Sequence, residues 1–524
     1  MNLNIKDTFN KELPADPIRN NTRRQVFNAA FSYAKPRKPK APKLVHVADE
    51  VAELLGLSKE EVQSDDFLKV FSGNEVMEGT DPYAMCYGGH QFGSWAGQLG
   101  DGRAINLAEV VHHKKRWALQ LKGAGETPYS RTADGLAVLR SSIREHLCSE
   151  AMHHLGVPTT RSLSLMLTGD EVMRDMMYDG NGAYEKGAVV CRVSPSFVRF
   201  GNFQILAARE DSKTLQELTD YTIRHFFPGI EEGTKEGYIQ FFEEVVRRTV
   251  EMIIHWQRVG FVHGVMNTDN MSILGLTIDF GPYGWLEGYD HGWTPNTTDR
   301  SHRRYRYGHQ PQIALWNLIQ LANALYPLVG EAPPFEKVLK KFQSDFEAGY
   351  FEMMKSKLGL TNSAPDDKTL INRLEEVLQT TETDMTIFYR RLADFNKTTE
   401  IDSEGKFLAI VKDAFYKPEE LEDKILKDWN DWFDSYKSRL AVEEIPDKER
   451  KTIMNKSNPK YVLRNYMAQV AIDAADQGDY TIVEELYSLL KNPYSEQPDF
   501  EKWFAKRPEW ARHKVGCSML SCSS

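Results

Sequence analysis

The sequence has few cysteines, no long apolar run and no excess of basic residues, and each shortage excludes a class of protein. Five cysteines in 524 residues are too few for a disulfide-stabilised secreted domain. The most apolar stretch, residues 312–330, is interrupted by Asn317, Gln320 and Asn323, so no membrane-spanning segment is expected. With 65 Lys and Arg against 75 Asp and Glu, the net charge is −10, and the chain is not expected to bind nucleic acid.

The N-terminus and the cysteine positions favour a reducing compartment. Residues 1–12 mix acidic and basic side chains and lack the apolar segment of a signal peptide, so a cytoplasmic location is expected. Cys517 and Cys522 lie in a polar tail. Cys522 is expected to be accessible and to form a redox link with Cys517 or with a thiol partner, although an inert exposed thiol explains the tail equally well. The other three cysteines are expected to be buried thiols: Cys86, Cys148 and Cys191.

The apolar pattern changes along the chain from mixed strands and helices to helices. Residues 117–122, 160–167 and 188–193 are typical of strands, and residues 136–155 have the four-residue spacing of a helix. From residue 197 on, helices dominate. We therefore expect an α+β fold in four regions. An N-terminal arm with helices (1–85) precedes a mixed lobe that contains a glycine-rich loop (86–200). A helical lobe with a candidate metal-binding hairpin (201–330) follows, and then a helical C-terminal extension that ends in the cysteine tail (331–524).

The second lobe contains a candidate metal site. Two short apolar runs within residues 271–279 flank Gly275, which predicts a tight hairpin. Such a hairpin would bring Asn270 opposite Asp279, and an amide oxygen beside a carboxylate suits Mg²⁺ held together with phosphates. Residues 279–281 read Asp-Phe-Gly, the metal-binding triplet of protein kinases. The alternative is that Asn270 and Asp279 only cap turns.

The first lobe carries a lysine and an acidic partner for it. Lys122 ends the strand predicted at residues 117–122, and Glu145 lies on the following helix. A strand lysine held by a helix glutamate is how a kinase-like lobe places positive charge against phosphates. An ordinary surface ion pair is the alternative.

Two glycine-containing stretches and two arginines are further candidates for binding a nucleotide. Residues 97–103 end at Arg103, and their adjacent backbone N–H groups suit phosphate oxygens, although a flexible turn is the alternative. Residues 122–135 could cover a nucleotide. Arg192 and Arg199 are candidate anion ligands, although each alone is more often a surface residue.

One residue that a protein kinase requires is missing. In a kinase the catalytic aspartate lies five residues before the metal-binding asparagine. Here that position is Val265, which cannot accept a proton. A true protein kinase is therefore disfavoured.

Several long motifs resemble the selenoprotein O family (YdiU/SelO), and the resemblance extends over nearly the whole chain. The motifs are Leu-Lys-Gly-Ala-Gly at residues 121–125 with Thr-Pro-Tyr-Ser-Arg at 127–131, Leu-Arg-Ser-Ser-Ile-Arg-Glu at 139–145, and His-Gly-Val-Met-Asn-Thr-Asp-Asn-Met at 263–271. Some members of the family carry selenocysteine at the antepenultimate position, where this chain has Cys522.

The resemblance implies a protein-kinase-like two-lobed fold that binds ATP in an inverted orientation. It implies transfer of AMP to Ser, Thr or Tyr hydroxyls of protein substrates, with release of diphosphate and with Mg²⁺ or Mn²⁺. Asp269 is implied as the proton acceptor, and Asn270 and Asp279 as the metal ligands. The implied nucleotide contacts are Gly100, Gly102, Arg103, Lys122, Asp134, Gly135, Arg192 and Arg199.

Two alternatives stay open on the sequence. UMP transfer from UTP, with Mn²⁺ as a candidate metal, belongs to the same reaction class. A nucleotide-binding pseudokinase scaffold is a different class, and the intact set of Asp269, Asn270 and Asp279 argues against it. The loop at residues 296–312, which contains Arg303, Arg304 and Arg306, occupies the place of a kinase activation segment, with a solvated basic loop as the alternative.

Overall fold

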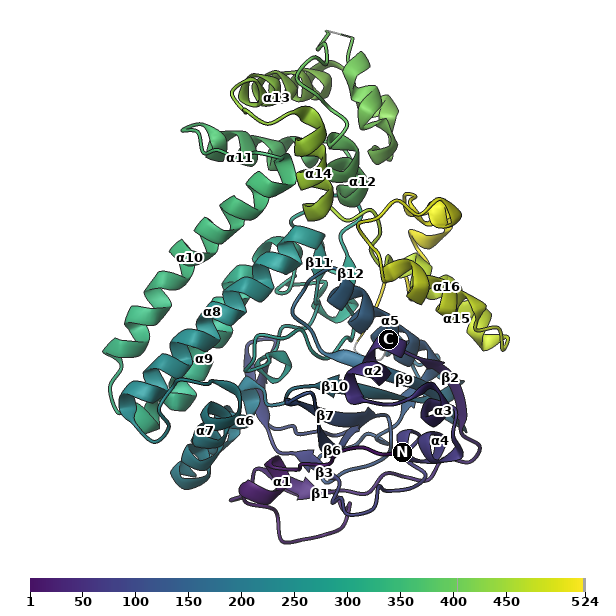
Figure 1. The fold of residues 1–524 in the computed structure, drawn as a ribbon, viewed down its shortest axis with the longest axis vertical. Coiled ribbons are helices and arrows are strands. Elements are labelled where there is room, and N and C mark those ends of the chain that lie inside the picture. The colour runs from purple at the N-terminus through teal and green to yellow at the C-terminus, as the bar shows by residue number, and fades with distance from the viewer. Residues whose placement is uncertain (403, 522–524) are drawn as a thin grey trace.

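An eight-stranded antiparallel sheet lies in the N-terminal part of the chain (Figure 1). A computed structural model, which describes residues 1–402 and 404–521, gives the strand order β1-β3-β6-β7-β10-β9-β2, with β8 paired to β10. The strands are β1 (Phe31–Tyr33), β2 (Lys43–Val47), β3 (Tyr83–Met85), β6 (Ala104–His112), β7 (Lys115–Lys122), β8 (Ala137–Val138), β9 (Arg161–Arg174) and β10 (Ala183–Ser194).

The three predicted strands are confirmed as parts of longer elements. Residues 117–122 fall in β7, while residues 160–167 and 188–193 fall mostly in β9 and within β10. β9 and β10 extend as one long antiparallel hairpin, which the shorter apolar runs did not indicate. The segment expected as an N-terminal arm with helices also contributes strands to the sheet, of which β1 and β2 form the two edges.

Helix α5 (Leu139–His154) contacts β9 and β10 with a buried apolar stripe. Leu139, Ile143, Leu147 and Ala151 are all buried, as their four-residue spacing predicted. The helix begins at Leu139 rather than at residue 136 because residues 137–138 form β8 against β10. Short helices α1 (Phe9–Glu12), α2 (Asp49–Leu55), α3 (Lys59–Val62) and α4 (Asp65–Phe71) precede it in the chain.

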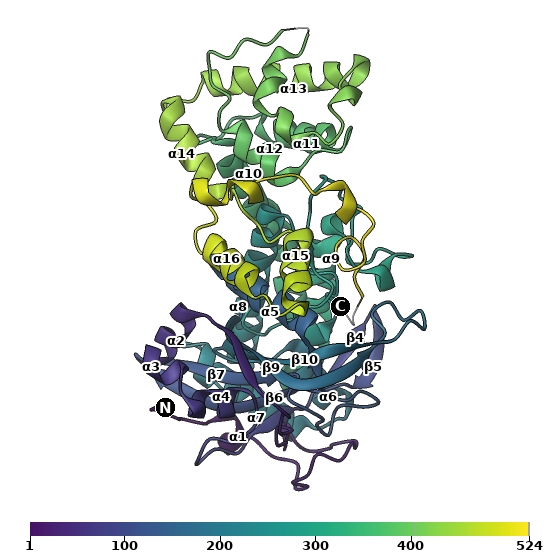
Figure 2. The same cartoon turned by 90° about the vertical axis from the view of Figure 1, so that its right-hand side faces the viewer.

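The rest of the chain is mainly helical (Figures 1 and 2). The long helices α8, α9 and α10 contact one another, and α11 to α14 form the far end of the molecule around a second hydrophobic cluster. Helices α15 and α16 return to contact α5. The bounds are α6 (Phe200–Ala208), α7 (Ser212–Phe226), α8 (Lys235–Val259), α9 (Gln310–Val329), α10 (Pro333–Leu358), α11 (Asp367–Leu378), α12 (Met385–Leu392), α13 (Asp423–Ala441), α14 (Asp447–Ser457), α15 (Asn465–Asp476) and α16 (Thr481–Leu490).

Two small two-stranded sheets lie outside the main sheet. One pairs β4 (Gly88–Gln91) with β5 (Ser94–Gln98), and the other pairs β11 (Phe261–Val262) with β12 (Gly284–Trp285). Within the described ranges, no helix is both long enough and apolar enough to cross a bilayer.

The tail before Cys522 is docked and not free, which corrects the expectation for Cys517. The Leu520 N–H donates to the Pro295 carbonyl (3.2 Å), and the Leu520 carbonyl accepts from the Thr297 N–H (2.8 Å). Leu520 and Cys517 are buried. Burial raises the pKa of the Cys517 thiol to about 11, so the reactive thiolate is scarce at neutral pH. Cys86, Cys148 and Cys191 are buried thiols as predicted, and Cys522 lies outside the described residues.

The docking of the tail is testable through the reactivity of Cys517. In a Cys522→Ser background, the contacts of the tail predict that Cys517 is alkylated slowly. Peptide mass spectrometry measures the rate of alkylation. Leu520→Ala removes a buried side chain, and we expect alkylation to accelerate at least about tenfold because the tail opens more often. Val442→Ala, at an exposed apolar residue, serves as the control. Rapid alkylation of Cys517 with Leu520 intact would show that the tail is not docked.

Candidate active site

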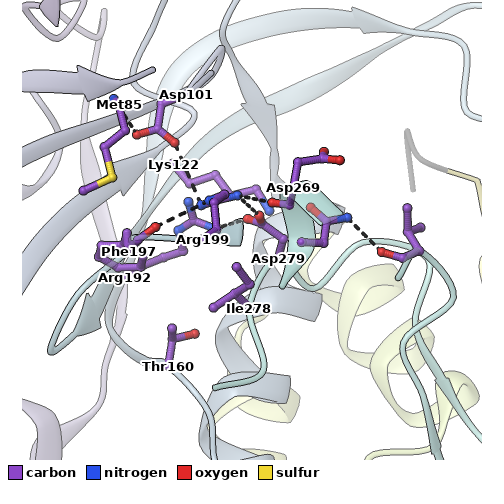
Figure 3. Close-up of polar contacts among 12 residues, drawn as sticks. Met85, Asp101, Lys122, Thr160, Arg192, Phe197, Arg199, Asp269, Ile278 and Asp279 are labelled. Carbon is purple, nitrogen blue, oxygen red and sulfur yellow. Dashed lines mark hydrogen bonds and ion pairs between the residues drawn. The ribbon is translucent and has the colours of Figure 1, made fainter. Parts of the chain in front are cut away.

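Three cations from three separate elements converge on one carboxylate, that of Asp279 (Figure 3). Arg192 lies near the end of β10, and its Nη1 donates to Asp279 Oδ1 at 2.5 Å. Arg199 precedes α6, and its Nη1 donates to Asp279 Oδ2. Lys122 ends β7 and contributes to the same electrostatic field. Because Arg192 and Arg199 are almost completely buried, their charges act in a weakly screened environment.

The predicted pairing of Lys122 with Glu145 is present. The Lys122 ammonium contacts Glu145 Oε2, and Arg192 Nη1 donates to Glu145 Oε1 at 3.2 Å. Burial lowers the pKa of Lys122, while the Glu145 charge opposes that shift. Glu145 therefore holds two cations of the cluster from its position on α5.

Asp279 is held ionised and in an unusual backbone conformation. Burial alone would raise its pKa, but Arg199, Arg192 and Lys122 outweigh burial and hold the pKa far below its usual range. Its φ of 56° lies in the left-handed region, which non-glycine residues seldom adopt. Strain of this kind is concentrated at functional sites, where the surrounding contacts hold it in place.

Asp269 adjoins the cation cluster through its backbone and turns its side chain away. Its carbonyl accepts from Arg199 Nη1 (2.9 Å), while its carboxylate points away from Arg199 and Asp279 (Figure 3). Oδ2 accepts from Gln91 Nε2 at 3.2 Å, and the buried Oδ1 has no hydrogen-bond partner among the described residues. Burial raises the pKa of Asp269 to about 6. The carboxylate is therefore a candidate base with one oxygen available.

The loop between Asn270 and Asp279 turns at Gly275 but is not the predicted hairpin. The Gly275 N–H donates to the Ser272 carbonyl (3.1 Å), as in a tight turn. The two flanking runs do not pair with each other, because Ser272 bridges to Arg199 and Thr277 bridges to Thr159. The hairpin prediction was wrong because each run finds a partner in another segment.

Arg199 provides the link that the hairpin was expected to provide. The same guanidinium bonds the Asp269 carbonyl, next to Asn270, and the Asp279 carboxylate. Asn270 Nδ2 donates to the Val265 carbonyl at 2.9 Å, which leaves the Asn270 amide oxygen for another ligand. Val265 thus contributes a backbone acceptor at the position where a kinase has its base.

The glycine loop lies beside the cluster, but several of its amides already have acceptors. The Asp101 N–H donates to Met85 (3.0 Å) and the Gly102 N–H to Gly100 (2.8 Å), so the loop does not offer the expected row of free N–H groups. A Cβ at Gly100 would lie 2.3 Å from the Tyr129 ring. Close packing on Tyr129 therefore accounts for a glycine at this position without a ligand.

Of the remaining predicted residues, Arg103 lies nearer to the cation cluster than Asp134 and Gly135 do. Arg103 is adjacent to Lys122 in the sheet, since its carbonyl accepts from the Gly123 N–H (2.7 Å) and its charge lowers the Lys122 pKa. Asp134 is bound by both terminal nitrogens of Arg174 at 2.8 Å. A Cβ at Gly135 would lie 2.2 Å from the Gly125 backbone, and no contact of Asp134 or Gly135 with the cluster is found among the described residues.

Sequence reasoning missed three polar residues of the site. Asp101 approaches Arg199 at 4.0 Å and accepts the Met85 N–H. Gln120 bonds Arg192 from the neighbouring strand, and Gln91 bonds Asp269. A signal existed for Gln120, which lies two residues before Lys122 in β7 and so shares its face of the strand. Nothing local in the sequence linked Gln91 to Asp269.

Comparison with known proteins identifies the family of the chain. A family model described as "Protein adenylyltransferase SelO" matches residues 21–491. "Protein nucleotidyltransferase YdiU" of Flavobacterium johnsoniae is 63% identical over 523 residues, covering 100% of both chains. The proteins of the same name from Rhodopirellula baltica and Aromatoleum aromaticum are 57% identical over 537 residues and 53% identical over 530 residues, covering 100% of this chain and 99% and 100% of the relatives.

The buried cations beside an ionised aspartate are thus part of a nucleotidyltransferase. The chain belongs to the protein adenylyltransferase SelO family, as its motifs indicated.

The role of Glu145 can be tested by removing its charge. Glu145→Gln leaves Lys122 and Arg192 buried with one carboxylate fewer, and we expect the free energy of unfolding to fall by about 3 kcal/mol. Urea denaturation measures the change. Glu126→Gln removes an exposed partner of Arg23 and is expected to cost less than about 1 kcal/mol. An equal free energy of unfolding for the two variants would contradict the role of Glu145 as the carboxylate that holds Lys122 and Arg192.

Proposed function

We propose that this protein transfers AMP from ATP to Ser, Thr or Tyr hydroxyls of other proteins and releases diphosphate. One observation carries the proposal: the cation cluster on Asp279 and the candidate base Asp269 meet at Arg199, while Val265 replaces the kinase base. We propose further that residues 86–200 and 201–330 act as two kinase-like lobes, with residues 1–85 and 331–524 as additions to them.

Lys122, Arg192 and Arg199 supply the positive charge for the phosphates. In the described state, Arg192 and Arg199 both form ion pairs with Asp279. On nucleotide binding the two arginines exchange Asp279 for phosphate oxygens, with Lys122 held in place by Glu145. A cluster of these three cations suits the diphosphate end of ATP better than adenine, which supports the inverted orientation.

The other residues implied for the nucleotide surround this cluster less closely. Arg103 is the nearest, beside Lys122. Gly100 and Gly102 contribute through the close approach of their backbone, and Asp134 and Gly135 through the loop that follows β7. Their contribution stays a prediction.

Asn270 and Asp279 fit a divalent cation, either Mg²⁺ or Mn²⁺. Asp279 is ionised at any ordinary pH, and its two oxygens already bind cationic groups, so the position is built for positive charge. The Asn270 amide oxygen is a second hard ligand. A bound ion would neutralise charge on the α-phosphate and on the leaving diphosphate.

Asp269 accepts the proton in the transfer step. The acceptor hydroxyl oxygen forms a bond to the α-phosphorus, and the bond from that phosphorus to the oxygen bridging the α- and β-phosphates breaks, so diphosphate leaves with that oxygen. The hydroxyl proton passes to the Asp269 carboxylate. The unpartnered Oδ1 of Asp269 is suited to this role. Arg199, bonded to the Asp269 carbonyl, places the base next to the phosphates.

The reaction class is testable with labelled nucleotide. ATP carrying label at the α-phosphate is expected to label protein in the presence of Mg²⁺ or Mn²⁺, whereas label at the γ-phosphate is not. Asp279→Asn, which keeps the side-chain shape, is expected to reduce labelling at least about a hundredfold because a metal ligand is lost. Retained γ-label without α-label would refute AMP transfer.

Two further measurements separate AMP transfer from the alternatives, which are UMP transfer and a non-catalytic scaffold. Competition by UTP, followed by intact mass, distinguishes transfer of UMP from transfer of AMP. A scaffold predicts ATP binding by calorimetry with no labelling of any protein.

The pH profile tests Asp269 as the base. Its pKa is raised to about 6, and a base must be ionised to act, so the transfer rate is expected to fall about tenfold per pH unit below pH 6 and to level off above it. Asp269→Asn is expected to reduce the rate by about 10²- to 10⁴-fold and to remove this dependence. Steady-state rates between pH 5 and 8 measure both. A wild-type rate that is unchanged through pH 6 would exclude Asp269.

A further inference from the structure

The β4–β5 hairpin presents two aromatic side chains to solvent. Phe92 and Trp95 are 38% and 41% exposed. Phe92 and Gly93 form the turn, with φ of 52° and 89°, a geometry that favours Asn-Gly. A phenylalanine is costly in the left-handed region, so its presence indicates that the exposed ring has a role of its own.

The base of this hairpin reaches Asp269. The Gln91 side chain donates to the Asp269 carboxylate, and the His90 N–H donates to Thr268 Oγ1 at 2.7 Å. A Cβ at Gly89 would lie 2.5 Å from Asp269 Oδ1. The carboxylate therefore faces the hairpin, while the Asp269 backbone faces the cation cluster.

An arginine-rich loop adjoins the hairpin on the same side. Phe92 N–H donates to Asn267 Oδ1 (3.1 Å) and to the Tyr305 hydroxyl (3.0 Å), which itself donates to Asn267 (2.6 Å). The Arg304 guanidinium lies 4.7 Å from the Trp316 ring centre and 3.4 Å from the position of a Cβ at Gly93. Ring contacts continue from Trp316 through His90 to Trp95.

The loop at residues 296–312 contains four arginines and a single acidic residue. Arg300, Arg303, Arg304 and Arg306 form no ion pair within 4.0 Å among residues 1–402 and 404–521, in a protein of net charge −10. The acidic residue of the loop, Asp299, is buried and accepts the N–H groups of Arg304 and Tyr305. Unpaired arginines within a Debye length of one another attract acidic groups.

We propose that Phe92, Trp95 and Arg304, here termed the acceptor surface, bind the polypeptide that receives the nucleotide. An apolar or aromatic side chain of the acceptor packs on Phe92 and Trp95, and an acidic side chain pairs with Arg304, so that the nearby hydroxyl reaches Asp269. The inference rests on the proposed function and adds a substrate class to it: hydroxyl residues flanked by acidic and aromatic residues. Aromatic and arginine side chains also bind single-stranded nucleic acid, but the Asp269 carboxylate, buried behind β4, repels a nearby phosphate backbone and suits a protein hydroxyl.

Peptide binding tests the acceptor surface without requiring transfer. The probes are two fluorescein-labelled synthetic peptides with one tyrosine and one phenylalanine two residues later, flanked by glutamates in one and by glutamines in the other. We expect the wild-type protein to bind the glutamate peptide at least about fivefold more tightly, measured by fluorescence anisotropy. Arg304→Gln is expected to remove that preference and Arg304→Lys to retain most of it. Trp95→Ala is expected to weaken both peptides about fivefold.

The same chain offers two matched control variants, and several results would contradict the proposal. Lys340→Gln and Tyr326→Ala change an exposed cation and an exposed aromatic residue elsewhere, and are expected to leave both affinities unchanged. Equal affinity of the wild type for the two peptides, or a preference that survives Arg304→Gln, would overturn the proposal. So would tighter binding of oligothymidylate through the same residues, or a dimer in sedimentation that Trp95→Ala disrupts.

Failure of the acceptor surface is distinguishable from failure of the proposed reaction. If the predicted binding pattern holds but no AMP is transferred to the glutamate peptide, the reaction is refuted and the surface stands. If AMP is transferred with the same KM by the wild type, Trp95→Ala and Arg304→Gln, the reaction stands and the surface is refuted.

Discussion

The site depends on the ionised carboxylate of Asp279. Lys122 at the end of β7, Arg192 in β10 and Arg199 before α6 each bring one cation to it, and each cation is too deeply buried to be left without a partner. Glu145 on α5 supplies the second anion, so the helix and the sheet are joined by charge as well as by apolar contact. In the absence of nucleotide, Glu145 and Asp279 offset two of the three positive charges. In the proposed function the same arginines that bond Asp279 bind the phosphates, so that ligand binding is an exchange of partners.

Asp269 divides the site into two environments. Its carbonyl belongs to the cation cluster through Arg199, and its carboxylate belongs to the β4–β5 hairpin through Gln91. A base placed in this way can receive a proton from the hairpin side while the reacting phosphorus lies on the cation side. Burial raises its pKa to about 6, which is close to the value that general-base catalysis near neutral pH favours.

Local patterns predicted much of the fold and the central residues of the site. The alternation in residues 117–122 and the spacing in α5 fixed the positions of Lys122 and Glu145, because a strand and a helix can be recognised from nearby residues alone. The hairpin at Gly275 was wrong because both of its runs bond to distant segments. Gln91 and Asp101 were missed for the same reason, because their partners lie 178 and 98 residues away in sequence. The spacing of neighbouring residues does not indicate such long-range contacts.

A crystal structure with a non-hydrolysable ATP analogue and Mn²⁺ tests the central claim most directly. The anomalous signal of the metal is expected between Asn270 and Asp279, in contact with an α-phosphate oxygen, with Arg192 and Arg199 moved onto the outer phosphates. Adenine lying against Lys122, Arg192 and Arg199, or a manganese peak remote from Asp279, would contradict the account.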